Sequence, residues 1–386
     1  MVKFFLINFI AFFSVAYFCC TDIYSQNRKF SILYDSSDVI KEEFYANIEN
    51  GDTIKDGNYT FYLPDGTINQ KGQFLNNMPS GLWKLYYENG LLHQKIEFRE
   101  GLRHGAYQTF YQDGNLQQKG YYQNGKLNGE FISYYPDGTT ESIVNYHNGI
   151  QHGITEMYYP NGEVFKRTDL SFGIENGIYQ EFYDDGSINY DGKKRNGNFE
   201  DSLKVYYQNG NLQRLCYYEN GLLKGEYKSF YKTGEAQIKC TYKKGVIEGK
   251  YTEYYQDGPV LQQGYYTNNL KEGLWMSYHQ NGAIHAIGKF TSDFYEGKWK
   301  VYYSNKKIKQ LGNYKEGKPE GFWIYYLEDG NIDSFGHYEN EMKQGLWIYY
   351  DYENDNTKRT TNIKIYKDNE AINTGKLFLK NKKDVE

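Results

Sequence analysis

Short runs of aromatic and aliphatic residues alternate with short polar turns along the chain, and the alternation recurs every 24 residues. In the segment GLWKLYYENG, which starts at Gly81, an apolar run is closed by the dipeptide Asn89-Gly90. We count Gly81 as position 0 of this pattern. The pattern occurs thirteen times without an insertion or deletion, and its position 0 is at Gly57, Gly81, Gly105, Gly129, Gly153, Gly177, Asp201, Gly225, Gly249, Gly273, Gly297, Gly321 and Gly345. A fixed period of this length is typical of repeat architectures.

Each column of the repeat keeps one chemical character. Position +5 is aromatic in all thirteen repeats, position +2 in eleven, and position +17 in ten of twelve. Position +8 is Asn or Asp in eleven repeats, position +9 is Gly in eleven, and a further Gly stands at +20 in eight of twelve. The five tryptophans all occupy +2: Trp83, Trp275, Trp299, Trp323 and Trp347.

The columns predict one β-hairpin per repeat. Asn-Gly or Asp-Gly between two apolar runs indicates a type I′ turn, because both residues tolerate positive φ. We therefore expect a strand at +2 to +6, a turn such as Asn89-Gly90, a second strand at +11 to +17, and another turn near +20, as at Glu100-Gly101. The predicted fold is all-β, an elongated single-layer antiparallel meander of about 13 tandem 24-residue hairpins. Asp201, the one position 0 that is not Gly, predicts a local irregularity.

A β-solenoid with one coil per repeat is the alternative architecture. Cys216 and Cys240 distinguish the two architectures, because they occupy position +15 of adjacent repeats. In a coil they would stack within disulfide range, whereas in a hairpin array they lie two strands apart, about 9.6 Å, beyond the reach of a disulfide. The regular Asn/Asp-Gly column favours hairpins, so we expect two free thiols.

The first 25 residues have the layout of a secretory signal peptide. A lone Lys3 precedes a long apolar run, and cleavage would leave Gln26 at the new N-terminus. An uncleaved anchor helix and a lipoprotein signal with lipid on Cys19 or Cys20 are the alternatives. The predicted location is therefore outside the cytoplasm: periplasm, cell surface or secreted, with anchorage by lipid or signal as the alternative.

The remaining chain divides into a repeat array and two ends. The repeats cover residues 57–368, and the array needs caps because its terminal strands would otherwise present open edges. Residues 26–56 are the predicted N-terminal cap, and residues 369–386 the C-terminal cap or tail.

The amino-acid composition disfavours several classes of fold and function. The chain holds 44 Tyr and 40 Gly, which disfavour a helical bundle, and 19% aromatic residues, which disfavour disorder. A formal net charge of -5 supplies no basic field of the kind that nucleic-acid binders use. We expect no nucleic-acid partner and no integral membrane domain after signal cleavage.

Residues that carry chemistry are scattered. The seven histidines lack the spacing of a metalloprotease motif, and no Cys-x-x-Cys is present for zinc. The recurring Asp of the turns supplies one carboxylate per 24 residues, too few ligands for calcium. No set of nucleophile and base is evident. The sequence predicts no enzyme activity, no catalytic residue, no metal and no cofactor.

Rows of Tyr and Trp have a second use beside packing, because exposed rows of this kind bind sugars, choline groups or peptides in repeat proteins. Tryptophan is concentrated in the C-terminal third of the chain. The candidate ligand or partner contacts are Trp275, Trp299, Trp323 and Trp347.

The pattern G-x-W-x-x-Y-Y-x-N-G-x-L, followed by an aromatic residue and Gly, resembles MORN repeats over residues 57–368. It is most similar to the bacterial repeat variant found in toxin–antitoxin-associated (YwqK-like) antitoxins. This resemblance implies a hairpin array that serves as a scaffold or interaction surface, with antitoxin action against a partner toxin as one role.

The leading hypothesis is a non-enzymatic exported repeat scaffold that mediates protein–protein interaction with an unidentified protein. A carbohydrate- or cell-envelope-binding module that uses the C-terminal Trp and Tyr rows is the alternative, with an envelope glycan as its ligand. An antitoxin-like protein that neutralises a partner toxin is the second alternative.

Overall fold

The computed structural model describes residues 27–352 and 359–377, and these residues form strands and turns without a helix. The predicted signal peptide therefore lies outside the described residues. Within the same ranges, no helix is present that is long and apolar enough to cross a membrane. The chain divides into an N-terminal unit that ends at Ser187 and a C-terminal unit that begins at Ile188.

The N-terminal unit holds fifteen strands in its described part. They are β1 (Arg28–Leu33), β2 (Ile40–Glu49), β3 (Asp52–Tyr62), β4 (Ile68–Leu75), β5 (Met78–Tyr86), β6 (Leu92–Arg99), β7 (Leu102–Phe110), β8 (Leu116–Gln123), β9 (Lys126–Leu127), β10 (Gly129–Tyr134), β11 (Thr140–His147), β12 (Ile150–Gln151), β13 (Gly153–Tyr158), β14 (Val164–Ser171) and β15 (Ile174–Phe182).

The C-terminal unit holds eighteen strands in its described part. They are β16 (Ile188–Arg195), β17 (Asn198–Tyr206), β18 (Leu212–Glu219), β19 (Leu222–Leu223), β20 (Gly225–Phe230), β21 (Ala236–Lys243), β22 (Val246–Ile247), β23 (Gly249–Tyr254), β24 (Val260–Thr267), β25 (Leu270–Tyr278), β26 (Ile284–Thr291), β27 (Phe294–Tyr302), β28 (Ile308–Lys315), β29 (Lys318–Tyr326), β30 (Ile332–Glu339), β31 (Met342–Tyr352), β32 (Arg359–Lys367) and β33 (Glu370–Leu377).

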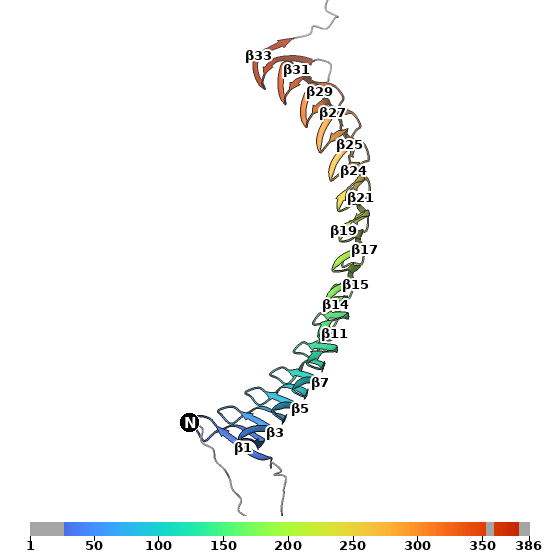
Figure 1. Ribbon diagram of the computed structural model, residues 1–386. Coiled ribbons are helices and arrows are strands. Elements are labelled where there is room, and N and C mark those ends of the chain that lie inside the picture. Colours follow the sequence, from blue (N-terminus) through green and yellow to red (C-terminus); the bar gives the residue numbers. More distant parts are fainter. Residues whose placement is uncertain (1–26, 353–358, 378–386) are drawn as a thin grey trace, which may run out of the picture. The chain divides into compact units, whose positions relative to one another are not determined.

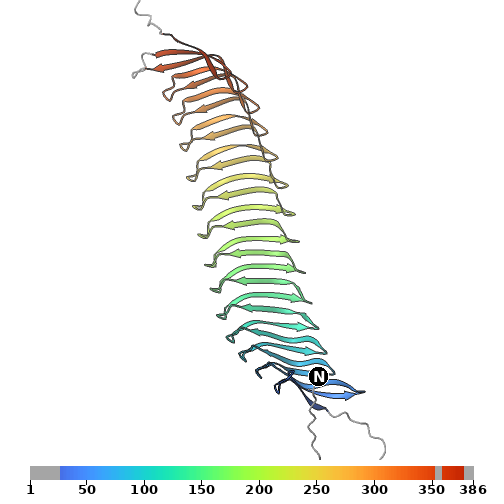
Figure 2. The same ribbon diagram turned by 90° about the vertical axis from the view of Figure 1, so that its left-hand side faces the viewer.

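Within each unit the strands pair antiparallel with their neighbours in chain order, apart from the two-residue strands β9, β12, β19 and β22, each of which pairs beside a turn. Figures 1 and 2 show each unit as one layer of successive hairpins. The predicted fold class is confirmed. Cys216 on β18 and Cys240 on β21 are both free thiols with β20 between them, as the hairpin architecture requires.

The sequence suggested a type I′ turn at Asn-Gly, but the structure has this type at the other turn of the repeat. At the Asn-Gly turn, the Gly90 N–H donates to the Tyr87 carbonyl, and Gly90 has positive φ (79°) while Asn89 does not. This is a three-residue loop whose Gly forms a bulge, rather than a type I′ turn. The type I′ conformation belongs to the other turn, where Glu100 and Gly101 have φ of 50° and 75°.

Position 0 supplies a bulge between consecutive hairpins. The register between β4 and β5 shifts after Lys71, so that the single residue Gly72 faces the three residues from Gly81 to Trp83. Gly81 has φ of 66°, which glycine adopts without steric cost. Asp201 adopts φ of 61° and preserves the same register shift in β16 and β17. The irregularity predicted at this residue is therefore absent, because Asp tolerates the left-handed region better than most side chains.

The two faces of the sheet differ in burial. Positions +2, +4, +13, +15 and +17 share one face, which we call the packed face, and it carries buried residues such as Ile96, Cys216 and Trp323. Positions +1, +3, +5, +14 and +16 share the other, which we call the open face. As expected, the aromatic residues at +2 and +5 lie on opposite faces.

Tyrosine at +6 connects consecutive hairpins at their loop edge. Its hydroxyl donates to the backbone carbonyl 23 residues later, as from Tyr87 to Phe110 at 2.7 Å. The same bond recurs at 2.7 to 3.0 Å from Tyr111, Tyr135, Tyr159, Tyr207, Tyr231, Tyr255 and Tyr303. A half-buried carbonyl is thereby satisfied in these eight loops, which explains why the column is mostly Tyr rather than Phe.

The ends of the array depart from the 24-residue period. The first turn with two successive residues at positive φ begins at Asn50, 26 residues before the next at Asn76, and the last begins at Asp368, 28 residues after Asn340. Strand β3 runs across the boundary predicted at residue 56, and β33 occupies the start of the predicted C-terminal cap. Residues 378–386 of that tail are not among those described.

Candidate functional site

The five tryptophans lie flat on glycines of the preceding repeat. Each Trp at +2 covers the Gly at +15, eleven residues earlier, so that a Cβ added to Gly312 would lie 2.1 Å from the Trp323 ring. The corresponding distances at the other four pairs are 2.1 to 2.2 Å: Gly72–Trp83, Gly264–Trp275, Gly288–Trp299 and Gly336–Trp347. Any side chain at +15 would therefore displace the indole.

Each indole N–H is also satisfied within the sheet. Nε1 of Trp323 donates to the carbonyl of Asn313 at 3.2 Å, and the other four donate to the residue that follows their glycine at 3.0 to 3.1 Å. Only 3%, 7%, 2% and 1% of Trp275, Trp299, Trp323 and Trp347 is exposed. The structure thus brings the four candidate contacts into one row on the packed face, where they hold consecutive hairpins together.

The sequence contained a signal for this arrangement that the column analysis missed. Where the next repeat has Trp at +2, position +15 is Gly. Where the next repeat has Tyr at +2, position +15 is a residue with a side chain, as in Cys216–Tyr227 and Thr168–Tyr179. Large and small residues alternate so that their volumes sum to a filled layer. The rule explains why each tryptophan stands over a glycine, although Gly120 and Gly192 lie under Phe131 and Leu203 instead.

Two cations lie against the tryptophan row. Nζ of Lys271 is 4.2 Å from the centroid of Trp275, and Nζ of Lys343 is 4.3 Å from that of Trp347. Burial lowers the pKa of Lys271. Beside it, a hollow of about 180 Å³ is bordered by His285 and the edges of Trp275 and Trp299. Burial, aided by the charge of His279, lowers the pKa of His285.

Metal-ligating side chains do not gather among the described residues: no group of three or more His, Cys, Asp or Glu could hold an ion there. The ring centroids of His147 and His152 are 6.3 Å apart, and those of His279 and His285 are 4.8 Å apart.

The open face of the C-terminal unit carries a continuous apolar surface. Five cross-strand neighbours on β28 to β32 form its centre: Leu311, Ile324, Phe335, Ile348 and Ile363. Beside this row, Phe322 and Leu346 are each 53% exposed and Ile365 is 37% exposed. We call these eight residues the apolar strip. The strip was not evident from the sequence, because its two central columns, +14 and +3, are lysine or polar in most other repeats.

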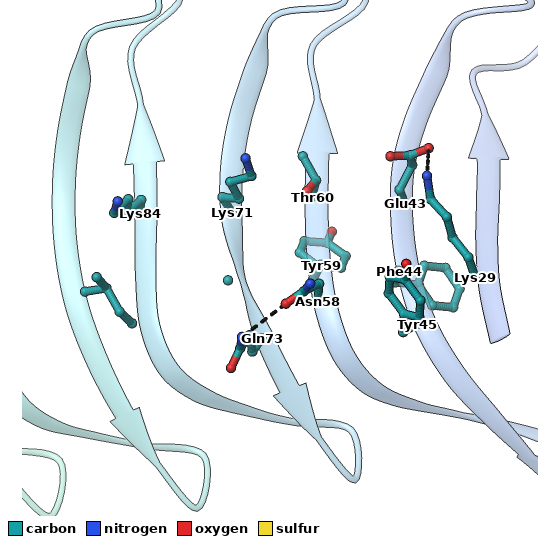
Figure 3. A pocket seen from close by; sticks show the side chains of 12 residues that line it. Lys29, Glu43, Phe44, Tyr45, Asn58, Tyr59, Thr60, Lys71, Gln73 and Lys84 are labelled. Carbon is teal, nitrogen blue, oxygen red and sulfur yellow. Dashed lines mark hydrogen bonds and ion pairs between the residues drawn. The ribbon is translucent and has the colours of Figure 1, made fainter. Parts of the chain in front are cut away.

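The open face of the N-terminal unit carries lysines in the same two columns, +14 and +3. Lys71, Lys84 and Lys95 are direct cross-strand neighbours on β4, β5 and β6, and Lys119 follows on β8 after Gln108 of β7. We call these four lysines the lysine row. Its first two members border an open hollow of about 590 Å³ over β1 to β5 (Figure 3).

The comparisons with known proteins agree with the repeat. The family model described as "MORN repeat variant" matches nine segments: residues 55–76, 79–100, 103–124, 127–148, 151–168, 202–220, 223–244, 247–268 and 295–316. No curated protein matches the chain.

Solved structures give only weak likenesses. They include the Tc holotoxin pore of Photorhabdus luminescens (12% identity, 89% of this chain and 24% of that chain, TM-score 0.16). TcdB2-TccC3 without its hypervariable C-terminal region is 10% identical over 89% of this chain and 24% of that chain (TM-score 0.13). A porin-like protein from Bacteroides uniformis is 10% identical over 71% of this chain and 96% of that chain (TM-score 0.13).

The present chain thus spans about a quarter of the length of the first two structures, and TM-scores this low add nothing to the fold assignment. The nine matched segments, in contrast, follow the 24-residue period through both units. With the hairpin repeats described above, they identify the chain as a MORN-repeat protein of the variant type.

Proposed function

We propose that this chain is a non-enzymatic exported scaffold that binds a protein partner through the apolar strip of its C-terminal unit. MORN repeats are generally interaction repeats for proteins or membranes, and the strip is the observation that carries the proposal. A contiguous apolar surface of this kind marks an interaction site.

The chemistry of the strip suits a protein surface. The rings of Phe322 and Phe335 lie 5.6 Å apart, and that of Tyr350 lies 6.1 Å from Phe335. Exposed aromatic side chains of this kind are enriched at the centres of protein interfaces, where they fill pockets of the partner. The five residues in the central row of the strip are all uncharged. A partner that covers the strip therefore does not bury an unpaired charge there.

Affinity capture with crosslinking from the envelope fraction tests the proposal. Phe322→Ser combined with Leu346→Ser should weaken retention of the principal partner by about tenfold or more, since two exposed anchors are lost. Leu274→Ser is the matched control, because Leu274 occupies the same +1 column and is 49% exposed but lies outside the strip. Equal retention by the double variant and the control would contradict the proposal.

Export is tested separately. N-terminal sequencing of the protein from the envelope or medium should find Gln26 as the first residue. A chain that begins at Met1 in the cytoplasmic fraction would contradict this part of the proposal.

The alternatives have less support. Sugar binding by Trp275, Trp299, Trp323 and Trp347 needs ring faces open to a ligand, and these indoles are at most 7% exposed. Antitoxin action rests on the resemblance alone, and neutralisation of a neighbouring gene's toxicity is the measurement that would support it.

A further inference from the structure

The lysine row places like charges side by side. Lys71 pairs directly with Lys84, and Lys84 with Lys95, so three ammonium-bearing side chains stand on three consecutive strands. Like charges in direct cross-strand positions destabilise a sheet. The fold does not require them, because the same columns carry Leu311 and Ile324 in the C-terminal unit. A repulsive arrangement that packing does not need is expected where a ligand supplies the opposite charge.

The row has no acidic partner of its own. Among the described residues, none of its four lysines forms an ion pair. Glu43, the carboxylate in the adjoining hollow, is bound by Lys29 at 2.8 Å, and this hydrogen bond lowers its pKa. The carboxylate of the hollow is therefore already bound by a lysine that lies outside the row.

Aromatic rings flank the lysines along the open face. Nζ of Lys95 lies 5.6 Å from the centroid of Phe110, and Nζ of Lys119 lies 5.5 Å from that of Tyr134. At the other end, the hollow exposes the amides of Asn58 and Gln73, which bond to each other at 3.1 Å (Figure 3). The surface thus offers cations, ring edges and amide groups in parallel rows.

We propose that the lysine row binds a linear acidic polysaccharide that lies across the strands of β4 to β8. Its anions, carboxylates or sulfate esters, would face the ammonium groups, while its hydroxyls would reach the amides of the hollow. The strands are about 4.8 Å apart, and an extended 1,4-linked pyranose advances by nearly this distance per sugar. Successive sugars of such a chain face opposite ways, so the anions on one face repeat every two sugars. This repeat is close to the about 9.6 Å between alternate strands, which carry Lys71, Lys95 and Lys119.

Other polyanions fit the geometry less well. An extended acidic peptide repeats its side chains on one face every second residue, about 6.6 Å, and falls out of step with the strands. Single-stranded nucleic acid needs open aromatic faces on which its bases stack. Here Phe110 and Tyr134 are half-buried beneath ammonium groups, and the net charge of -5 provides no wider attraction.

Binding of the full chain to defined polymers tests the proposal. The probes are polygalacturonate and cellulose sulfate, which are both 1,4-linked and separate carboxylate from sulfate recognition, and neutral hydroxyethyl cellulose. Lys71→Gln, Lys84→Gln and Lys95→Gln together should weaken binding of the acidic polymer by about tenfold or more. The triple variant Lys228→Gln, Lys239→Gln and Lys300→Gln is the matched control, with the same columns and the same charge change in the C-terminal unit. It should retain affinity within about twofold.

Both triple variants should fold, because the replaced side chains are not part of the packed face. Their melting temperatures check this expectation. The proposal is overturned if the wild-type chain binds neither acidic polymer, or if both triple variants lose affinity equally. Tighter binding of poly-glutamate, an oligodeoxynucleotide or anionic vesicles than of both acidic polymers would also overturn it. This site is independent of the apolar strip, so neither result depends on the protein partner.

Discussion

Every tryptophan of this protein stands over a glycine. Trp323 rests on Gly312 and sends its N–H past it to the next carbonyl, and the other four indoles repeat the arrangement. Tyr at the same position instead faces a residue with a side chain, as Tyr227 faces Cys216. At the residue scale the core is therefore a row of size-matched pairs.

Gly312→Ala should reduce the free energy of unfolding by about 1–3 kcal/mol, because its Cβ would overlap the Trp323 ring. Urea denaturation checks this value. Gly375→Ala is the control: a Cβ there meets nothing within 4 Å and φ is not positive, so stability should stay nearly unchanged. Combining Gly312→Cys with Trp323→Tyr recreates the natural Cys216–Tyr227 pair and should recover part of the loss. A double variant no better than Gly312→Ala would refute the size-matching rule.

Burial raises the pKa of Cys240 to about 11 from an ordinary 9.0. The folded state thus holds this thiol's proton more tightly than the unfolded state, so its contribution to stability is complete below pH 9 and disappears as the pH rises toward 11. Burial likewise raises the pKa of Tyr242 to about 12, which adds a loss of the same sign above pH 10.

Urea midpoints measured between pH 8 and pH 11 should therefore fall steadily above pH 9. Cys240→Ala should show a shallower fall than the wild type over the same range, despite its lower stability at pH 8. Parallel curves for the two proteins would show that the thiol does not contribute.

At the element scale, each hairpin is bounded by two different turns. The loop at +8 and +9 places one residue, Gly, at positive φ, whereas the turn at +19 and +20 places two there. Most of the latter begin with Asn, which tolerates this conformation, but one begins with Phe172, at φ of 51° and 65% exposed. An aromatic residue in this conformation carries steric strain.

Phe172→Asn should raise the free energy of unfolding by about 1 kcal/mol, which is the usual cost of the left-handed conformation for such a side chain. Thermal unfolding measures the change. Phe165→Asn is the control, since Phe165 is also exposed, at 39%, but lies in β14 without positive φ. A lower melting temperature for Phe172→Asn would mean that the ring contact with His152, at 5.0 Å, outweighs the strain.

The repeat columns were sufficient to predict the hairpins, their order and the free thiols at 216 and 240. They did not assign the turn types, because Asn-Gly is compatible with both a type I′ turn and a bulged three-residue loop. The lysine row and the apolar strip were also missed. Cross-strand neighbours such as Lys71, Lys84 and Lys95 are 13 and 11 positions apart in the sequence and become neighbours only after the bulge at position 0 sets the register.

On the scale of the whole molecule, each repeat contacts chiefly the next one, so the fold has no shared centre. Such arrays tolerate changes in repeat number, provided that each new junction packs as well as the old. The size-matched pairs decide which junctions meet this condition.

Two variants of the C-terminal unit, each lacking 24 residues, should therefore differ in stability. Removing residues 273–296 places Trp299 after Gly264, a pair of the native kind, whereas removing residues 249–272 places Trp275 after Cys240. The second variant should be less stable than the first by about 1–3 kcal/mol, since the cysteine side chain occupies the space of the indole. Denaturant midpoints compare them, and equal stabilities would show that the junction pair is unimportant.

The uneven placement of the tryptophans makes ultraviolet emission a selective reporter. Four of the five indoles lie in the C-terminal unit, buried and away from water, so their fluorescence should be blue-shifted and should follow the separation of hairpins in that unit. Trp83 is the one such fluorophore of the N-terminal unit. Replacing it with Phe would leave an optical signal from one half of the chain, without an attached dye.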